Sequence, residues 1–232
     1  MADLTRNNII EIIKKTRIKI QDYEIDLQNL NLSGLDLSNL FLKNANLTNT
    51  NLEGTNLENT NLNNAKLINV NLKKAKLYQT DLTNANLSKS NIRNTLLFYT
   101  TMVNANLSNA KLMHTELNSI NLNNANLSNI DLSYSKWDNV ILYNANLNGA
   151  NLMNVEIKNT NITSGNLSNT DLSEGNICDS DLYFSDLINA NLTNTVFSNT
   201  NLKYVDFDNT DVSTTKINNC IINYRRNRKA IF

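Results

Sequence analysis

An apolar residue recurs at every fifth position over most of this 232-residue chain. The stretch NLTNTNLEGTNLENTNLNNAKL, residues 46–67, places a leucine at positions 47, 52, 57, 62 and 67. The same frame continues without a break from Leu27 to Ile222, and all forty of its central positions are apolar. The fold must therefore bury one side chain in every five along this length, because apolar burial is the main driving force of folding.

Regular helices and flat strands do not meet that requirement. On an α-helix five residues advance by ~500°, so the central residues would spiral over every face. On a flat strand an odd spacing places alternate central residues on opposite faces. We therefore expect each pentapeptide to be a short extended segment followed by a corner. Its central residue, called i, and the residue at i−2 would face inward.

The other positions of the pentapeptide favour such a corner. Position i−1 is Asn or Asp in 27 of the forty units, and position i+2 is Asn in 23 of them. Position i−2 is mostly small, with Thr and Ala the commonest residues. Short polar side chains suit tight turns because they bond backbone groups locally or tolerate unusual dihedral angles. Residues i−1, i+1 and i+2 are thus predicted to face outward.

A slower period of twenty residues indicates the number of sides. Alanine recurs with this spacing at i−2, at positions 45, 65, 85, 105, 125 and 145. Twenty residues are four pentapeptides, so one coil has four sides, and forty pentapeptides make about ten coils. At ~4.8 Å per stacked layer the rod would be ~48 Å long.

Pentapeptides such as NANLT, TNLEN, NANLS and TDLSE resemble the pentapeptide-repeat family, whose consensus is A-(D/N)-L-x-x. The resemblance covers residues 25–223. It implies an all-β fold, a right-handed quadrilateral β-helix with i and i−2 lining the interior. The handedness comes from the resemblance and not from the spacing. The chain contains no proline, which suits a coil whose backbone N–H groups bond its neighbours.

Both ends of a solenoid need covering, since open ends invite edge pairing. Residues 1–24 are predicted to be an N-terminal capping helix and its lead-in, with an amphipathic helix at 5–16 and a capping box of Asn8 with Glu11. A partner-binding helix is the alternative. Residues 224–232 form a basic tail, interpreted as loosely capping. C-terminal segments mediate dimerisation in the quinolone-resistance branch of the family, which is the other interpretation.

Composition excludes several classes of protein. The chain has 21 basic and 21 acidic residues, whereas a general nucleic-acid binder would carry a basic excess. No apolar run approaches the ~20 residues of a membrane span, and the lysines near the N-terminus do not suit a signal peptide. Two cysteines make no disulfide framework, which favours a cytoplasmic location. Cys178 is predicted outward and Cys220 inward, on different sides, so no disulfide is expected between them.

The sequence contains few candidates for chemistry. The interior columns are filled by Leu and small residues, leaving no room for a small-molecule substrate. The single histidine, His114, falls at a corner and has no partner residues for a metal site or a catalytic triad. We therefore expect a protein that is not an enzyme and that needs no cofactor or metal.

Two groups of outward residues depart from the Asn, Ser and Thr background. The first is a candidate interaction patch at neighbouring outward positions, and exposed apolar patches are typical of contact sites. The second is a corner ladder of aromatic residues spaced by twenty, which could equally stabilise neighbouring coils. The patch consists of Tyr78, Leu96, Phe98, Tyr99 and Val103. The ladder consists of Tyr183, Phe184, Tyr204 and Tyr224.

Three functions suit a rod of this kind to different degrees. A rigid scaffold that binds an unidentified protein, or that associates with itself, needs only a rod with a local patch. A DNA mimic that binds DNA gyrase, as in the quinolone-resistance branch, needs a negative stripe along one side. Residues 171–211 hold eight acids against one lysine, but these acids are predicted on all four sides. Ice binding would use outward threonines, and the regular threonines here point inward. The scaffold is the favoured prediction.

Overall fold

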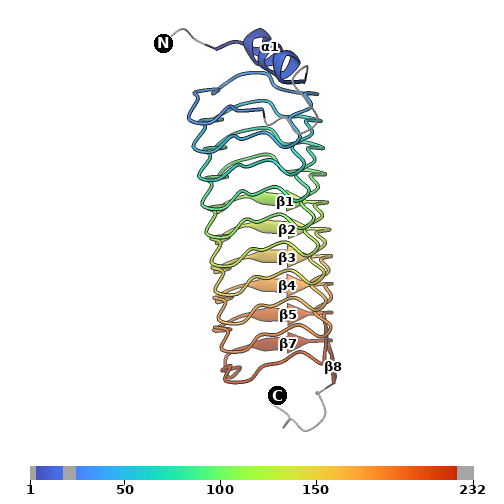
Figure 1. Ribbon diagram of the computed structural model, residues 1–232. Coiled ribbons are helices and arrows are strands. Elements are labelled where there is room, and N and C mark those ends of the chain that lie inside the picture. The colour runs from blue at the N-terminus through green and yellow to red at the C-terminus, as the bar shows by residue number, and fades with distance from the viewer. Residues whose placement is uncertain (1–3, 18–24, 224–232) are drawn as a thin grey trace.

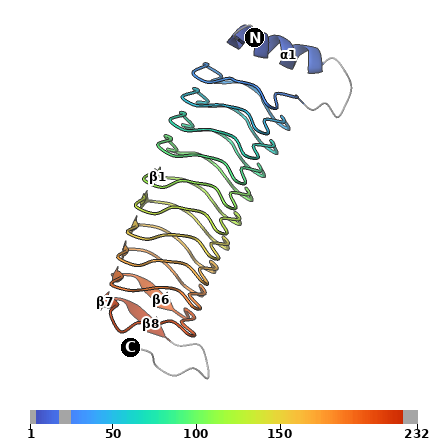
Figure 2. The ribbon, with the colours of Figure 1, turned by 90° about the vertical axis from the view of Figure 1, so that its left-hand side faces the viewer.

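The structure is a computed structural model that describes residues 4–17, with side chains as far as residue 14, and residues 25–223. Residues 25–223 wind into a straight rod of stacked coils, and helix α1 (Arg6–Arg17) lies across the N-terminal end of the rod (Figures 1 and 2). The expected β-solenoid with a short N-terminal helix is confirmed. The lead-in at 18–24 and the tail at 224–232 lie outside the described residues.

Each coil contains twenty residues. Parallel β-bridges join residues twenty apart along the rod, from Asp26 with Asn46 to Asp186 with Asp206. Four pentapeptides therefore make one coil, one to each side. We name the sides by their central residues: face A holds positions 27, 47 and onward to 207, face B 32 to 212, face C 37 to 217, and face D 42 to 222.

Continuous strands form on two of these faces. Face C carries a six-stranded parallel sheet in the order β1-β2-β3-β4-β5-β7, which is stacked along the rod in Figure 1. The central residues there include Trp137, Ile157 and Phe197, and aromatic and β-branched side chains favour extended backbone. The strands are β1 (Glu116–Asn118), β2 (Lys136–Asp138), β3 (Glu156–Lys158), β4 (Asn176–Cys178), β5 (Val196–Ser198) and β7 (Lys216–Asn218), with β6 (Asn201–Lys203) paired to β8 (Ile221–Asn223) on face D.

The interior is a continuous apolar core. From Leu27 to Phe207 every central residue is buried, as the period of five predicts. Burying one leucine side chain contributes roughly 1.5–3 kcal/mol, so the driving force is spread along the rod. Trp137 is the largest buried side chain, and its indole N–H donates a hydrogen bond to Ser135 Oγ at 2.8 Å. The void beside it measures only about 10 Å³, so the lumen is packed.

The backbone hydrogen bonds explain the shape of the pentapeptide. In residues 46–50 all five N–H groups have an acceptor: three bond to adjacent coils, one closes the corner, and one bonds to a side chain. A proline at position 46, 47, 49 or 50 would remove one of the four backbone–backbone hydrogen bonds. The bonds are Asn46 N to Ile25 O, Leu47 N to Lys66 O, Asn49 N to Ile68 O, Thr50 N to Leu47 O, and Thr48 N to Asn46 Oδ1, at 2.7–3.2 Å.

The two asparagine columns have different roles. At i−1 the side-chain oxygen accepts a hydrogen bond from the N–H of residue i+1, as Asn46 does from Thr48. This hydrogen bond spans the inward residue i that lies between them. At i+2 the backbone is left-handed at every described position from Asn29 to Asn219 except Thr214. Only Gly, Asn and Asp adopt that conformation readily. The bias toward Asn at i+2 is therefore conformational.

Inward threonines and outward asparagines also join successive coils. Thr50 Oγ1 donates to the carbonyl of Leu27 at 2.7 Å, so its hydroxyl is satisfied inside the core. Asn71 Nδ2 donates to Asn51 Oδ1 at 3.0 Å, and Asn51 donates in the same way to Asn31. Such side-chain ladders stabilise stacked in-register strands. Polar residues in both columns thus contribute to the fold.

Helix α1 (Arg6–Arg17) matches the predicted helix at 5–16 to within one residue, but its capping box lies one turn earlier than the sequence suggested. Thr5 N–H donates to Asn8 Oδ1 at 2.7 Å and Asn8 N–H donates to Thr5 Oγ1 at 3.3 Å, which is a reciprocal capping box. The predicted box of Asn8 with Glu11 is wrong, because Asn8 already lies at the third helical position. Ile9 and Ile13 are buried against the first coils, as expected of a cap.

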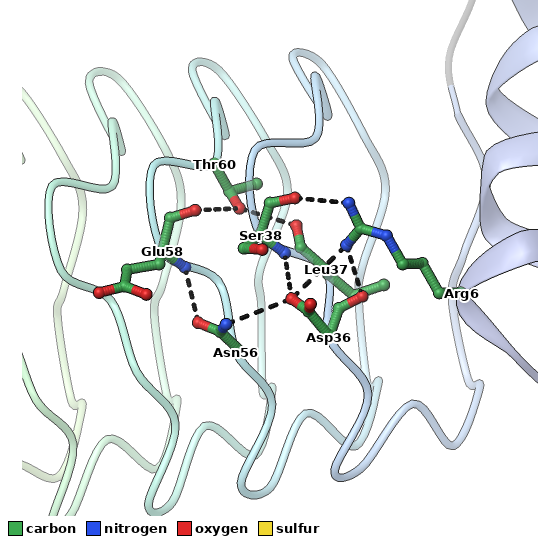
Figure 3. Close-up of polar contacts among 7 residues, drawn as sticks. All are labelled: Arg6, Asp36, Leu37, Ser38, Asn56, Glu58 and Thr60. Carbon is green, nitrogen blue, oxygen red and sulfur yellow. Dashed lines mark hydrogen bonds and ion pairs between the residues drawn. The ribbon is translucent and has the colours of Figure 1, made fainter.

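Arg6 attaches this helix to face C. Its guanidinium donates to the carbonyl oxygens of Asp36 at 2.6 Å and Ser38 at 2.8 Å, and lies 3.5 Å from the Asp36 carboxylate (Figure 3). Hydrogen bonds from the side chain and backbone of Ser38 lower the pKa of Asp36, and the charge of Arg6 lowers it further. The contact therefore holds a cation over backbone oxygens at the rim of the rod.

Within the described part of the chain, no helix combines the length and the apolar character needed to cross a bilayer.

Candidate interaction face

Face C has fewer asparagine and aspartate residues at its outward i−1 positions than any other face, although face D also departs from the pattern at Phe41, Thr101, Ile141 and Ile221. On face A the i−1 column is Asn or Asp at every coil except at Lys66. On face C the same column contains lysine, leucine, glutamate and valine, and these residues cannot make the Asx-type bond that asparagine makes at i−1. After Asp36 and Asn56, which keep the Asx-type bond, the i−1 column of face C runs Lys76, Leu96, Glu116, Lys136, Glu156, Asn176, Val196 and Lys216. After Ser38 and Glu58, its i+1 column runs Tyr78, Phe98, Asn118, Asp138, Lys158, Cys178, Ser198 and Asn218.

Four of the five residues in the predicted patch lie together on face C or at its corner. The side chains of Leu96 and Tyr99 are 48% and 54% exposed. The ring of Tyr78 packs edge-on against Tyr99, with 5.5 Å between centroids. Phe98 is half-buried between them and the next coil. Val103, also half-buried, lies beyond the corner on face D, so it is not part of the same flat surface.

A shallow groove of about 450 Å³ continues from this patch across the strands that follow it. Phe98 lines its N-terminal end and Cys178 its C-terminal end, with strands β1 to β4 between them. The floor is formed at the backbone of central residues such as Trp137, whose side chain is buried in the lumen, and the walls include charged side chains. Of the predicted patch, Phe98 alone lines the groove. The groove is lined by Phe98, Glu116, Leu117, Asn118, Lys136, Trp137, Asp138, Glu156, Ile157, Lys158, Asn176 and Cys178.

The charges around the groove alternate in sign. Lys136 and Glu156 are register partners on β2 and β3, and Lys136 Nζ lies 3.2 Å from Glu156 Oε2. Asp138 and Lys158 are register partners in the other outward column. Both residues of the ion pair are more than half exposed, so the pair adds well under ~1 kcal/mol to stability. This exposed ion pair therefore contributes little to the stability of the fold.

Cys178 lies at the C-terminal end of the groove. Burial raises the pKa of its thiol, and the nearby carboxylate of Asp179 raises it further. The thiol is therefore mainly protonated at neutral pH and is a poor nucleophile. Cys178 and Cys220 are both free thiols, as the sequence predicted.

The charged part of the groove was not predicted from the sequence. Glu116, Lys136 and Glu156 are twenty residues apart, with Lys158 two residues beyond the last, and they look like scattered surface charges when the chain is read linearly. Regrouping the sequence in rows of twenty would have placed them in two columns of one face. The sequence therefore contains the pattern of charges on face C, but the pattern appears only when the residues are grouped by face.

The corner ladder also forms in space, at the edge of face D. The rings of Tyr183 and Phe184 are 4.9 Å apart, and Phe184 and Tyr204 are 5.2 Å apart. Tyr183 further contacts Tyr204 edge-on at 5.7 Å. The three rings therefore stabilise one another between two coils. Tyr224, the fourth residue of the predicted ladder, lies outside the described residues.

The single histidine of the chain packs against an aromatic ring. His114 stacks on Tyr134 one coil further along, with 5.1 Å between ring centroids, at the corner that follows face B. Among the described residues, no three His, Cys, Asp or Glu side chains form a group that could hold a metal ion. Stacking on Tyr134 accounts for His114 at this corner without a catalytic or metal-binding role.

The acids of residues 171–211 do not line one face. Asp186, Asp206 and Asp208 belong to face A, whereas Asp171 belongs to face B and Asp181 to face D. A duplex-like row of negative charge needs closely spaced acids along one side. This arrangement gives no support to a DNA-mimicking stripe.

The comparison with family profiles decides what the repeat is. A profile described as pentapeptide repeats matches in eight copies, over residues 25–64, 60–97, 90–129, 120–159, 141–177 and 180–219. The chain belongs to the pentapeptide-repeat family. Among curated proteins none is significantly similar to it.

Solved structures of other pentapeptide-repeat proteins resemble the rod. HetL from the cyanobacterium Nostoc sp. strain PCC 7120, a protein involved in regulating heterocyst differentiation, is 23% identical with a TM-score of 0.71. The alignment covers 95% of this chain and 98% of HetL. QnrB1, a plasmid-mediated fluoroquinolone resistance protein, is 14% identical with a TM-score of 0.49, over 84% of this chain and 89% of its own. At these identities the likeness to HetL shows the fold alone.

Proposed function

We propose that this pentapeptide-repeat protein is a rigid, non-enzymatic scaffold that binds a protein through face C. One observation carries the proposal: face C replaces the asparagines that serve the coil with apolar and charged residues. Such replacements forgo Asx-type hydrogen bonds that stabilise the pentapeptide. A surface that forgoes local stabilisation while exposing Leu96 and Tyr99 is typical of a binding site.

The shape of face C suits a macromolecular partner better than a small molecule. The groove is open and shallow, and its floor is the outer surface of a flat parallel sheet. Small-molecule sites are enclosed and bury most of the ligand, whereas protein interfaces have an apolar centre with a polar rim. On face C the aromatic patch lies beside alternating charges, which could fix the register of a partner.

The test is affinity capture from the native host, quantified by mass spectrometry. The double variant Leu96→Asn, Phe98→Ser gives face C the residue types found at the matching positions 86 and 88 of face A. It should fold normally and retain less than about a tenth of any specific partner, since interface anchors contribute about 1–2 kcal/mol each or more. Equal capture by the double variant would contradict the assignment of face C.

The matched control removes half-buried apolar groups from another face. Ile68→Ser and Ile188→Ser lie on face A at the same i+1 position that Phe98 occupies on face C. These variants should capture partners as the unchanged protein does. A supercoiling assay with DNA gyrase tests the alternative function separately. Inhibition that depends on Asp206 and Asp208 would assign the activity to face A and overturn the proposal.

A further inference from the structure

We propose that face C binds a second copy of this chain, with the two rods side by side and parallel. This inference rests on the proposed function, because it names the partner of the same face. The two copies would be related by a twofold axis that runs along the rods between the two C faces. The observation behind it is that the outward columns of face C are chemically complementary to each other.

The geometry of such a pair fixes which residues meet. A twofold axis parallel to the rods keeps each coil level with the same coil of the partner and reverses the strand direction across the interface. Residue i−1 of one copy then lies opposite residue i+1 of the same coil in the other. Each contact occurs twice, once on either side of the axis. The test of self-complementarity is therefore whether i−1 and i+1 of each coil are suitable partners.

On face C they are suitable partners in four coils. Lys136 would face Asp138 of the partner subunit, and Glu156 would face Lys158 of the partner subunit, which gives four ion pairs in the dimer. In the patch, Leu96 would face Phe98 of the partner subunit. One coil earlier, Lys76 would lie over the ring of Tyr78 of the partner subunit, a favourable cation–π contact. No coil of face C carries like charges at i−1 and i+1.

The other faces lack complementary charge, although Ile141 and Tyr143 on face D form an apolar pair of the same kind as Leu96 and Phe98. Within residues 25–223, oppositely charged residues at i−1 and i+1 of one pentapeptide occur on face C alone. Face A instead carries Asp206 and Asp208 at these two positions, which would repel each other in a parallel pair. Complementary charge selects a partner mainly by excluding wrong arrangements. The pattern therefore selects both the face and the orientation.

An antiparallel pair is the strongest competitor. With its twofold axis between β2 and β3, it would place Lys136 against Glu156 of the partner subunit and Asp138 against Lys158 of the partner subunit. The same register brings Lys76 against Lys216 of the partner subunit and leaves Phe98 opposite Ser198 of the partner subunit. Leu96 would meet Val196 of the partner subunit in this register. The parallel pair avoids the like-charge contact and matches Leu96 with Phe98 of the partner subunit instead.

The size of the face sets the expected strength. Three residues of strand are ~10 Å wide and eight coils ~38 Å tall, so the dimer would bury on the order of 1,000 Å² in total. That is at the lower limit of specific interfaces. We therefore expect a reversible dimer with a dissociation constant in the micromolar range, on the order of 10 µM.

Sedimentation equilibrium over about 1–500 µM protein tests the association itself. The mass should rise toward that of a dimer with concentration. Lys136→Asp should weaken the dimer at least tenfold, and adding Asp138→Lys should restore it, because the swapped charges again face each other. Lys111→Asp on face B is the matched control, since Lys111 is paired in register with Asp131 as Lys136 is with Glu156. A monomer at every concentration would overturn the inference, as would a dimer that Lys136→Asp leaves unchanged.

Crosslinking between single-cysteine variants tests the orientation. All variants carry Cys220→Ser; one keeps Cys178, the second combines Cys178→Ser with Asn176→Cys, and the third combines Cys178→Ser with Asn118→Cys. A short bismaleimide should join the first variant to the second in a parallel dimer, since i+1 faces i−1 of the same coil. Joining the first variant to the third instead would show the antiparallel pair and overturn the proposed arrangement.

The two proposals fail in distinguishable ways. If the chain stays monomeric but host proteins are captured through face C, the scaffold function stands and self-association is rejected. If the dimer forms and no host protein distinguishes face C variants, the face serves self-association alone. If neither is observed, both proposals are rejected.

Discussion

At the scale of single residues, the corner position i+2 is the most constrained. Its backbone is left-handed in coil after coil, with φ between 50° and 70°. Asparagine tolerates this conformation, but the chain also places Lys89, Tyr99 and Phe184 there, with φ near 60°. These residues cost more than asparagine at such a corner. The large side chains at corners therefore trade some stability for surface chemistry.

Substitution at a corner should measure this constraint. Asn109, at φ 59°, changed to Val is expected to lower the free energy of unfolding by about 1–3 kcal/mol, because a β-branched residue is strained there. Lys89→Gly should instead raise it by up to about 1 kcal/mol. Chemical denaturation measures both changes. Ser108→Val, at the neighbouring i+1 position, is the control, and a loss there equal to that of Asn109→Val would contradict the conformational explanation.

Much at this scale could be predicted from the sequence, and the limit has a physical reason. The inward residues from Leu27 to Ile222 follow from hydrophobic spacing alone. The role of Asn46 in accepting the N–H of Thr48 does not, because asparagine at i−1 and at i+2 looks the same in a sequence. Which of them binds the backbone and which adopts positive φ depends on the direction in which the corner turns.

At the scale of elements, the contact between α1 and the first coils includes an ion pair and should therefore depend on pH. Arg6 bonds two carbonyl oxygens of face C, and Asp36 lies beside its guanidinium. Sequence reasoning found the helix but misplaced its capping box, because Thr5 and Asn8 form a box that the Asn8–Glu11 pattern concealed. The contacts of Arg6 were not predictable, since they join residues thirty apart.

Acid should loosen this contact. The folded state lowers the pKa of Asp36, so the stability that this group contributes is present above the ordinary pKa of Asp and is lost as the pH falls through the lowered value. Hydrogen exchange of the amides of α1 should therefore accelerate, relative to the central coils, below about pH 4. Asp36→Asn should remove most of this pH dependence, whereas Asp211→Asn at the far end should not. Unchanged protection of α1 in acid would contradict the prediction.

At the scale of the whole molecule, the rod is less well buried at its C-terminal end than in its middle. Central residues from Leu27 to Phe207 are at most 4% exposed, whereas Val212, Ile217 and Ile222 are only partly buried. Each coil of a solenoid is stabilised mainly by its neighbours. Residues 206–223 should thus exchange amide hydrogens faster than residues 120–180. Uniform protection along the rod would show a degree of cooperativity that nearest-neighbour contacts do not provide.

The face-level organisation was the part that the sequence concealed. Leu96, Phe98 and Tyr99 were found because they are adjacent in the chain, whereas Lys136 and Glu156 meet only across coils. Tyr183, Phe184 and Tyr204 were found because aromatic residues are rare here and their spacing of twenty is conspicuous. Charged residues are common on any protein surface, so their spacing alone does not indicate a site.

The twenty-residue period also sets the units in which this molecule can lengthen or shorten. Loss or gain of a single pentapeptide would rotate everything beyond it by a quarter turn, moving the second half of the face C columns onto a neighbouring side. Removal of twenty residues would instead shorten the rod by one coil and leave every column aligned. Insertions and deletions that spare the columns of face C must therefore come in multiples of a full coil.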